Sequence, residues 1–191
     1  MKKIISIFGI ISSIIIFLTG CTSSQPKAGN TSQPKTKSNN SIVIKGNTFS
    51  GKVMTDNNGK QEMTVHFDKN NHAIVTYNGI SKSDSTWTRK IISGRYAISG
   101  KTLGVIDEDG MILGYNSEKS LANQKLPTKM VKKHDRGSTT ELKIHKRYLA
   151  FNEKYKLYPT KTTIISNYND YIDKMQKQYN KNTQSYRIEV S

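Results

Sequence analysis

The fold is decided by the stretch Met63-Thr64-Val65-His66-Phe67-Asp68-Lys69-Asn70-Asn71-His72-Ala73-Ile74-Val75-Thr76-Tyr77. Apolar side chains occupy every second position on both sides of a polar centre. A period of two predicts a β-strand with one buried face. The centre, Asp68 to Asn71, consists of residues that favour turns. The stretch therefore predicts an antiparallel hairpin.

Further strands are predicted on both sides of this hairpin. Before it, Ile42, Ile44, Thr48 and Val53 bracket a first strand, and the turn signal Asn57-Asn58-Gly59 follows. Gly46-Asn47 suits a bulge or bend in that strand. The hairpin is thus expected to continue an antiparallel meander that begins near residue 42.

After the hairpin, Asn78-Gly79 is expected to open a polar loop that runs to Asp84. A strand is predicted from Trp87 to Ile98, with a break or bulge at Ser93-Gly94, and Ser99-Gly100 then turns the chain. Asp109-Gly110, between apolar segments, is a strong signal for one more hairpin. Residues 42–116 therefore predict about six short strands.

These elements predict a mainly β (α+β) protein, in which an antiparallel meander curls into a small barrel or sandwich and a C-terminal amphipathic helix follows. Residues 42–116 resemble the lipocalin-like meanders of small Gram-positive lipoproteins. The resemblance rests on the turns and on the strand type Gly94-Arg95-Tyr96-Ala97-Ile98, and it transfers no functional residue. Because hydrophobic residues make up only 34% of the chain, we expect the interior to be packed solid.

Residues 117–191 form a basic, tyrosine-rich part that is expected to pack on the same domain. Leu142 and Ile144 alternate with Lys143 and His145, which predicts one more strand with a basic face. The last residues, from Ser185 to Val190, alternate in the same way and are expected to close a sheet edge.

A helix is predicted at about residues 163–181, with Thr160, Thr162 or Thr163 as its cap. Its apolar residues recur at spacings of three and four, which places them on one helical face: Ile164, Ile165, Tyr168, Tyr171, Ile172, Met175 and Tyr179. This face is expected to pack on the sheet. The alternative is that it binds a partner protein.

The N-terminus predicts where the protein resides. Lys2 and Lys3 precede the apolar run from Ile4 to Leu18, which is too short for a membrane span and suits a signal peptide over residues 1–20. Leu18-Thr19-Gly20-Cys21 then resembles the lipobox of bacterial lipoproteins. The resemblance implies recognition of Leu18, Thr19 and Gly20 by a signal peptidase and a diacylglyceryl group on Cys21, with a palmitate-type acyl anchor. The expected location is the extracytoplasmic face of a Gram-positive cell membrane.

Residues 21–41 are expected to form a disordered tether from the lipidated cysteine, because Thr22 to Ser41 contains one alanine and otherwise no aromatic, aliphatic or acidic residue. Cys21 is the only cysteine, so disulfides and thiol chemistry are excluded once it is modified. The formal charge of +16 becomes +14 when Lys2 and Lys3 are removed with the signal peptide.

This positive charge favours anionic partners, namely wall polymers or lipid headgroups, and nucleic acid is not expected. The residues expected to form a patch for such a partner are Lys129, Lys132, Lys133, Arg136, Lys143, Lys146 and Arg147. Tyrosines interleaved with lysines in this region could stack on bases or sugars. The alternative is a solvated basic face over tyrosines that belong to the core.

No catalytic residue, metal ligand or cofactor is predicted. The four histidines, at positions 66, 72, 134 and 145, show no ligand spacing. Asp107 to Gly110 resembles part of a calcium loop but lacks the remaining ligands, and a turn explains it better. We therefore expect a non-enzymatic binding or envelope-associated module. The alternative is an accessory subunit of a cell-envelope machine, for conjugation, phage exclusion or competence, that contacts protein through its C-terminal helix.

Overall fold

The computed structural model describes residues 42–55, 59–82, 85–133 and 137–189. The predicted signal peptide, lipobox and tether occupy residues 1–41 and therefore lie outside the described residues. The elements are β1 (Thr48–Thr55), β2 (Gly59–Phe67), β3 (His72–Ile80), β4 (Trp87–Ser99), β5 (Thr102–Tyr115), α1 (Glu118–Ala122), β6 (Lys129–Lys133), β7 (Thr139–Ile144), β8 (Leu149–Phe151), β9 (Tyr155–Thr160) and α2 (Tyr168–Glu189).

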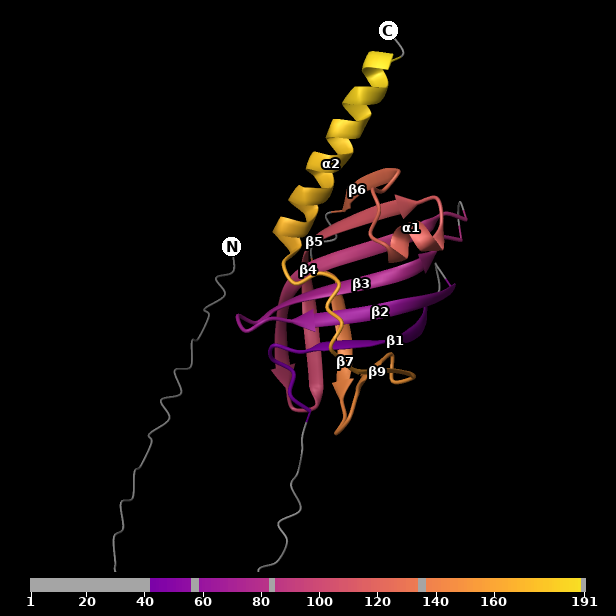
Figure 1. Cartoon of the computed structure of the whole chain (residues 1–191). Helices are drawn as coiled ribbons and strands as arrows, with labels where there is room; N and C mark the ends of the chain where they lie inside the picture. The colour runs from indigo at the N-terminus through magenta and orange to yellow at the C-terminus, as the bar shows by residue number, and fades with distance from the viewer. Residues whose placement is uncertain (1–41, 56–58, 83–84, 134–136, 190–191) are drawn as a thin grey trace, which may run out of the picture. The chain divides into compact units, whose positions relative to one another are not determined.

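Eight antiparallel strands close into a barrel (Figure 1). The order β4-β3-β2-β1-β9-β8-β7-β5 is completed by pairing of β5 with β4. The contact between β1 and β9, which we call the seam, is short. The two strands share only the pairs from Thr48↔Thr160 to Ser50↔Tyr158. β6 pairs with the far half of β5, so β6 and β7 together line one side of that strand. The predicted fold class is confirmed, and the structure is a barrel and not a sandwich.

The hairpin of residues 63–77 is confirmed as β2 and β3, with Phe67 paired to Ala73. Asp68 shapes its turn by accepting hydrogen bonds at Oδ1 from the backbone N–H groups of Asn70 (2.7 Å) and His72 (2.8 Å). Asn71 takes the left-handed conformation that such turns need, at φ 64°. The bulge at Ser93-Gly94 is also confirmed, because the register of β4 against β5 shifts there.

The predicted hairpin at Asp109-Gly110 is wrong. β5 runs through both residues, Asp109 pairs with Ser93, and Gly110 pairs with Ile92 and Lys133. The pairing of Asp109 with β4, and of Gly110 with β4 and β6, holds these residues extended, so tertiary pairing overrides the local turn preference. The described residues within 42–116 therefore form five strands, where about six were predicted.

Two smaller predictions are also corrected. The first strand begins at Thr48, after Ile42 and Ile44, because Gly46 turns the chain at φ 76°. Asn78 and Gly79 belong to β3, where they pair with Glu62 and Gln61. The loop therefore begins only after Ile80.

Apolar side chains fill the barrel interior. The fully buried ones come from almost every strand and include Phe49, Met63, Val65, Phe67, Leu103, Val105, Leu142, Leu149 and Leu157. The Phe67 ring meets Phe49 and Tyr96 edge to face, with centroids 5.9 Å and 4.9 Å away. These side chains form the core of the barrel.

The interior tyrosine Tyr77 predicts alkaline instability. Burial raises its pKa to about 12, a hydrogen bond with Thr140 opposes the shift, and the charge of Asp107 adds to it. An unfolded tyrosine titrates near pH 10. The neutral phenol therefore stabilises the barrel below pH 10, and this contribution, about 2 kcal/mol, is lost between pH 10 and 12. Urea unfolding at stepped pH should show the decline, and Tyr77→Phe should make it shallower while the contribution of other buried tyrosines, such as Tyr168, remains. Equal slopes in the two proteins would contradict the assignment.

A second apolar layer covers the outside of β3, β4 and β5. It joins Ile74, Ile91, Met111, Leu113 and Tyr115 of the strands to residues of the helices and of the segment before α2, namely Leu121, Ile165, Tyr168, Ile172 and Met175. The predicted packing of the helix on the sheet is confirmed. Within the described residues, neither helix is long and apolar enough to cross a membrane.

The predicted bounds and caps of the helix are wrong. α2 begins at Tyr168, because Asn167 Oδ1 accepts the N–H of Asp170 (3.2 Å) and serves as the cap. Thr163 instead contacts Thr48 across the sheet, at 2.8 Å between the hydroxyl oxygens. The helix continues to Glu189, so the predicted strand over residues 185–190 does not form in its described part.

Arg89 joins these outer elements, although it is only 2% exposed. Its N–H groups donate to Asn78 Oδ1 (2.8 Å), the Tyr171 hydroxyl (3.0 Å) and the Leu121 carbonyl (3.3 Å). One side chain thus connects β3, α2 and α1 to β4.

We expect Arg89→Ala to destabilise the fold by about 3 kcal/mol, because three polar groups lose a charged partner inside the protein. Arg95→Ala is the matched control, since the Arg95 side chain is 72% exposed where it pairs with Glu108. Removing that surface pair should change the free energy of unfolding by less than about 1 kcal/mol. Equal losses in a denaturant titration would show that Arg89 does not join the layers.

Candidate functional site

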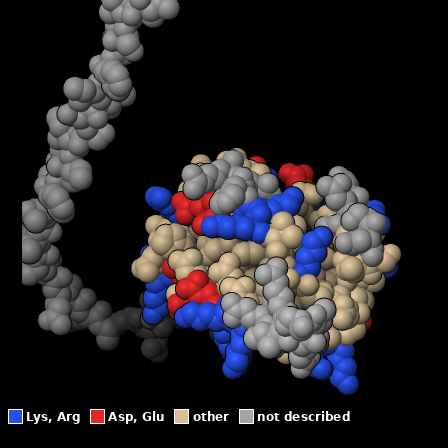
Figure 2. Space-filling view, turned by 90° about the horizontal axis from the view of Figure 1, so that it is seen from above, with Lys and Arg blue, Asp and Glu red and all other residues tan. Residues whose placement is uncertain are grey.

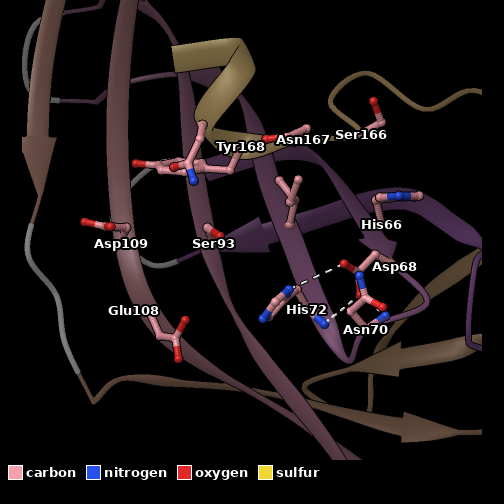
Figure 3. Close-up of a pocket in the computed structure, with 12 residues that line it drawn as sticks. His66, Asp68, Asn70, His72, Ser93, Glu108, Asp109, Ser166, Asn167 and Tyr168 are labelled. Atoms are coloured by element: carbon pink, nitrogen blue, oxygen red, sulfur yellow. Dashed lines mark hydrogen bonds and ion pairs between the residues drawn. The ribbon is translucent and has the colours of Figure 1, made fainter. Parts of the chain in front are cut away.

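A polar pocket of about 440 Å³ lies outside the barrel (Figure 3). The β2–β3 turn forms one wall, the middle of β5 forms another, and the start of α2 covers it. Its lining residues are His66, Asp68, Asn70, His72, Ile74, Ser93, Glu108, Asp109, Ser166, Asn167, Tyr168 and Asn169. The pocket therefore combines carboxylates, imidazoles, amides and hydroxyls.

Asp68 and His72 form a pair at the turn, with 3.5 Å between Asp68 Oδ2 and His72 Nδ1. Burial would raise the pKa of Asp68, but the backbone N–H groups of His72 and Asn70 and the nearby His72 ring lower it overall. Asp68 is thus a carboxylate at neutral pH. Because the His72 side chain is 54% exposed, the pair lies open to a ligand.

His66 belongs to a different hydrogen-bond chain. Its Nδ1 lies 2.9 Å from the Thr48 hydroxyl, which in turn contacts Thr163. Burial lowers the pKa of His66, and the charge of Asp68 only partly opposes this. The ring is therefore neutral at neutral pH and ties β2 to the segment that crosses towards α2.

The remaining wall of the pocket carries two acidic side chains, each of which lies beside a basic side chain. Glu108 accepts a hydrogen bond from Arg95 Nε at 2.7 Å, and Asp109 lies 3.7 Å from Lys132 Nζ. Tyr168 closes this side, and burial, together with the charge of Asp109, raises its pKa to about 12. The pocket thus presents neutral donors and acceptors around few uncompensated charges.

The groups that line the pocket suit recognition of a polar ligand. The Thr48 hydroxyl, which contacts the imidazole of His66, belongs to a residue that is 3% exposed and is out of reach of a substrate. No three acidic or histidine side chains of the described residues are placed to hold a metal ion. The pocket can instead hydrogen-bond hydroxyl, amide or cationic groups.

The structure divides the predicted basic patch into two groups. Lys129, Lys132 and Lys133 lie on β6, while Lys143 lies on β7 and Lys146 and Arg147 lie in the turn after it. Lys132 is opposite Met111 of β5, and Lys143 is opposite Thr102. Nine residues of strand separate these positions, or about 30 Å. Arg136 lies outside the described residues, as do Leu18, Thr19, Gly20 and Cys21.

The second group combines with exposed aromatic rings into what we call the tyrosine–lysine surface: Lys101, Lys143, His145, Lys146, Arg147, Tyr148, Lys156 and Tyr158. The rings of His145 and Tyr148 stack at 4.4 Å, and Tyr158 lies 5.8 Å from Tyr148. Lys156 Nζ lies 5.2 Å from the centre of the Tyr148 ring. Tyr158 is 52% exposed, so this cluster of rings is not part of the core.

Comparison with protein-family models, curated proteins and solved structures finds no match. A functional assignment therefore rests on the polar pocket and on the tyrosine–lysine surface. Seen from above, the molecule shows blue lysine and arginine side chains on several sides and red acidic side chains in a few places (Figure 2).

The pocket was not found from the sequence, although a signal for it exists. His66, Asp68 and His72 surround the predicted turn, and a tight hairpin must bring the ends of its strands together. Glu108 and Asp109 could not be added, because they were expected to form a turn of their own. The mixture of tyrosines and lysines in the tyrosine–lysine surface is evident in the sequence. The spacing of its aromatic residues, however, fits neither a strand nor a helix, so their arrangement could not be predicted.

Proposed function

We propose that this chain is a lipid-anchored extracytoplasmic binding module without catalytic activity, whose basic surface recognises an anionic partner. The observation that carries the proposal is the tyrosine–lysine surface, where Lys156 lies over the half-buried Tyr148 ring and this ring stacks on the exposed His145. A filled interior and the buried Thr48 hydroxyl support a role in binding over one in catalysis. The sequence supports the anchor through Leu18-Thr19-Gly20-Cys21.

The anchor is tested by Cys21→Ala in the full chain. In cells fed labelled palmitate, the label should be incorporated into the unchanged chain and not into the variant, because the Cys21 thiol is the attachment point. The variant should also lose its processing at Cys21. Equal incorporation of label would overturn this part of the proposal.

The anionic partner is tested by retention of the lipidated chain, in detergent, on immobilised anionic wall polymer. Retention should fall steeply as salt shortens the range of the electrostatic attraction, to about 3 Å at 1 M. The double variant Tyr148→Ala with Tyr158→Ala should be retained more weakly than the unchanged chain, although its net charge is the same. Absence of retention at every ionic strength on both anionic polymer and anionic lipid would overturn the basic surface as a binding site.

A second candidate function uses α2. Its described side chains after Met175 are exposed up to Asn182 except for Tyr179, which is half-buried. This favours contact with an envelope protein, as an accessory subunit. A photo-crosslinker at Lys177 should then give one defined adduct in cells, and the same group at Lys69 on the β2–β3 turn should not. Identical adducts from the two positions would count against a contact through α2.

A further inference from the structure

We propose that the tyrosine–lysine surface docks on the anionic lipid headgroups of the anchoring membrane, so that the barrel is held against the membrane in one orientation. The inference rests on the proposed lipid anchor. It goes further by naming the anionic partner and the face that meets it.

The first argument is the place where the chain enters the barrel. Ile42, the first described residue, shares a depression of about 620 Å³ with Lys101, Lys143, His145 and Lys146. The chain from Cys21 therefore arrives beside the tyrosine–lysine surface. The 20 residues from Thr22 to Ser41 have the composition of a flexible chain, which would span about 25 Å on average. The β6 lysines lie about 30 Å farther along β5.

The second argument is charge. Lys101, Lys146, Arg147 and Lys156 are exposed. The acidic residues near them are Glu141, which pairs with Lys143 at 3.0 Å, and Glu153 at the depression. The surface thus keeps an excess of positive charge. Lysine and arginine close to an anionic leaflet are attracted to it, and a short connection to the anchor keeps their local concentration high.

The third argument is the apolar and aromatic content of the same end. Val43 is 66% exposed beside Ile42, and Ile98 is 50% exposed three residues before Lys101. Tyr148 and Tyr158 add amphipathic rings, the side-chain type enriched at membrane interfaces. Cations with exposed apolar and tyrosine side chains suit a headgroup layer better than a purely ionic polymer.

The experiment uses the lipidated chain in vesicles of phosphatidylcholine with about 30 mol% phosphatidylglycerol, a lipid mixture chosen for its negative surface. Because Cys21 is the only cysteine and is blocked by lipid, Ser99→Cys provides one site for a fluorophore beside Lys101. A quencher on the headgroups then reports docking. Lys119→Cys, on the exposed side of α1, is the control position.

We expect strong quenching at position 99 and at least fivefold less at position 119. Replacing Lys101, Lys146, Arg147 and Lys156 by Gln should reduce quenching at position 99 about fivefold, as should neutral vesicles or about 0.5 M salt. The matched control replaces Lys125, Lys129, Lys132 and Lys133 by Gln and should leave it unchanged. All eight side chains are exposed, so both variants should fold.

Equal quenching at the two positions, or an equal loss in both glutamine variants, would overturn the docked orientation. Release of position 99 by a small excess of soluble wall polymer would overturn it in favour of the polymer as the partner. Failure of the anchor is a separate result, since the chain would then not float with the vesicles at all. A chain that floats without quenching would retain the anchor and refute the docking.

Discussion

Gly94→Ala should be among the most destabilising single substitutions in this barrel. Gly94 lies at the bulge, where it pairs with Asp107 while Ser93 pairs with Asp109. A Cβ atom there would collide with the carbonyl oxygen of Ile106 and lie 2.8 Å from its carbonyl carbon and 3.3 Å from the Cα of Asp107. These are backbone atoms, so no rotamer change relieves the clash. We expect a loss of about 3 kcal/mol or more, measured by urea unfolding.

Gly104→Ala is the matched control for this result. Gly104 lies on β5 opposite Ala97 of the same strand pair, and a Cβ atom there would meet only the Thr139 methyl group, at 3.5 Å. Alanine should cost nothing or stabilise slightly, because glycine is a poor strand residue. Equal stability of the two variants would show that the bulge tolerates a side chain.

Gly51→Ala should open the barrel at its seam. A Cβ atom on Gly51 would collide with the carbonyl oxygen of Lys156 and lie 3.0 Å from Leu157 Cδ2. β9 would have to move away from β1, although these strands share only three residue pairs. We expect a loss of about 3 kcal/mol and faster amide exchange.

The pattern of exchange distinguishes this effect from general destabilisation. Amides of β1 and β9 should lose protection while the long β4–β5 pair keeps it. Uniform loss of protection in both pairs would contradict a local opening at the seam. Gly104→Ala again serves as the control, because it adds the same methyl group away from the seam.

Much of the barrel could be predicted from residues that act locally. The hairpin at residues 63–77, the bulge at Ser93-Gly94 and the apolar face of α2 that packs on the sheet follow from alternation, turn residues and helical spacing. The predictions fail where pairing with a strand that is distant in sequence determines the backbone conformation. Asp109-Gly110 has the composition of a turn, yet it lies between β4 and β6 and stays extended.

The candidate sites were harder to predict because they need the closed topology. The basic residues of the predicted patch are near each other in sequence, but the six that the structure describes are divided between β6 and the β7 region, at opposite halves of β5. Conversely, Asp68 and Glu108 are distant in sequence and line one pocket. The lipocalin-like resemblance and the lipid anchor stay predictions.

With the proposed lipid anchor, copies of this chain would share one membrane surface, and β6 then has a consequence for how they meet. Within the described chain it pairs only with β5, so its other edge presents unpaired backbone groups. Molecules confined to two dimensions meet often, and an open strand edge can template pairing between copies. Lys129, Lys132 and Lys133 place like charges along that edge, and two such edges would repel each other. The lysines of β6 thus fit a role in keeping crowded neighbours apart.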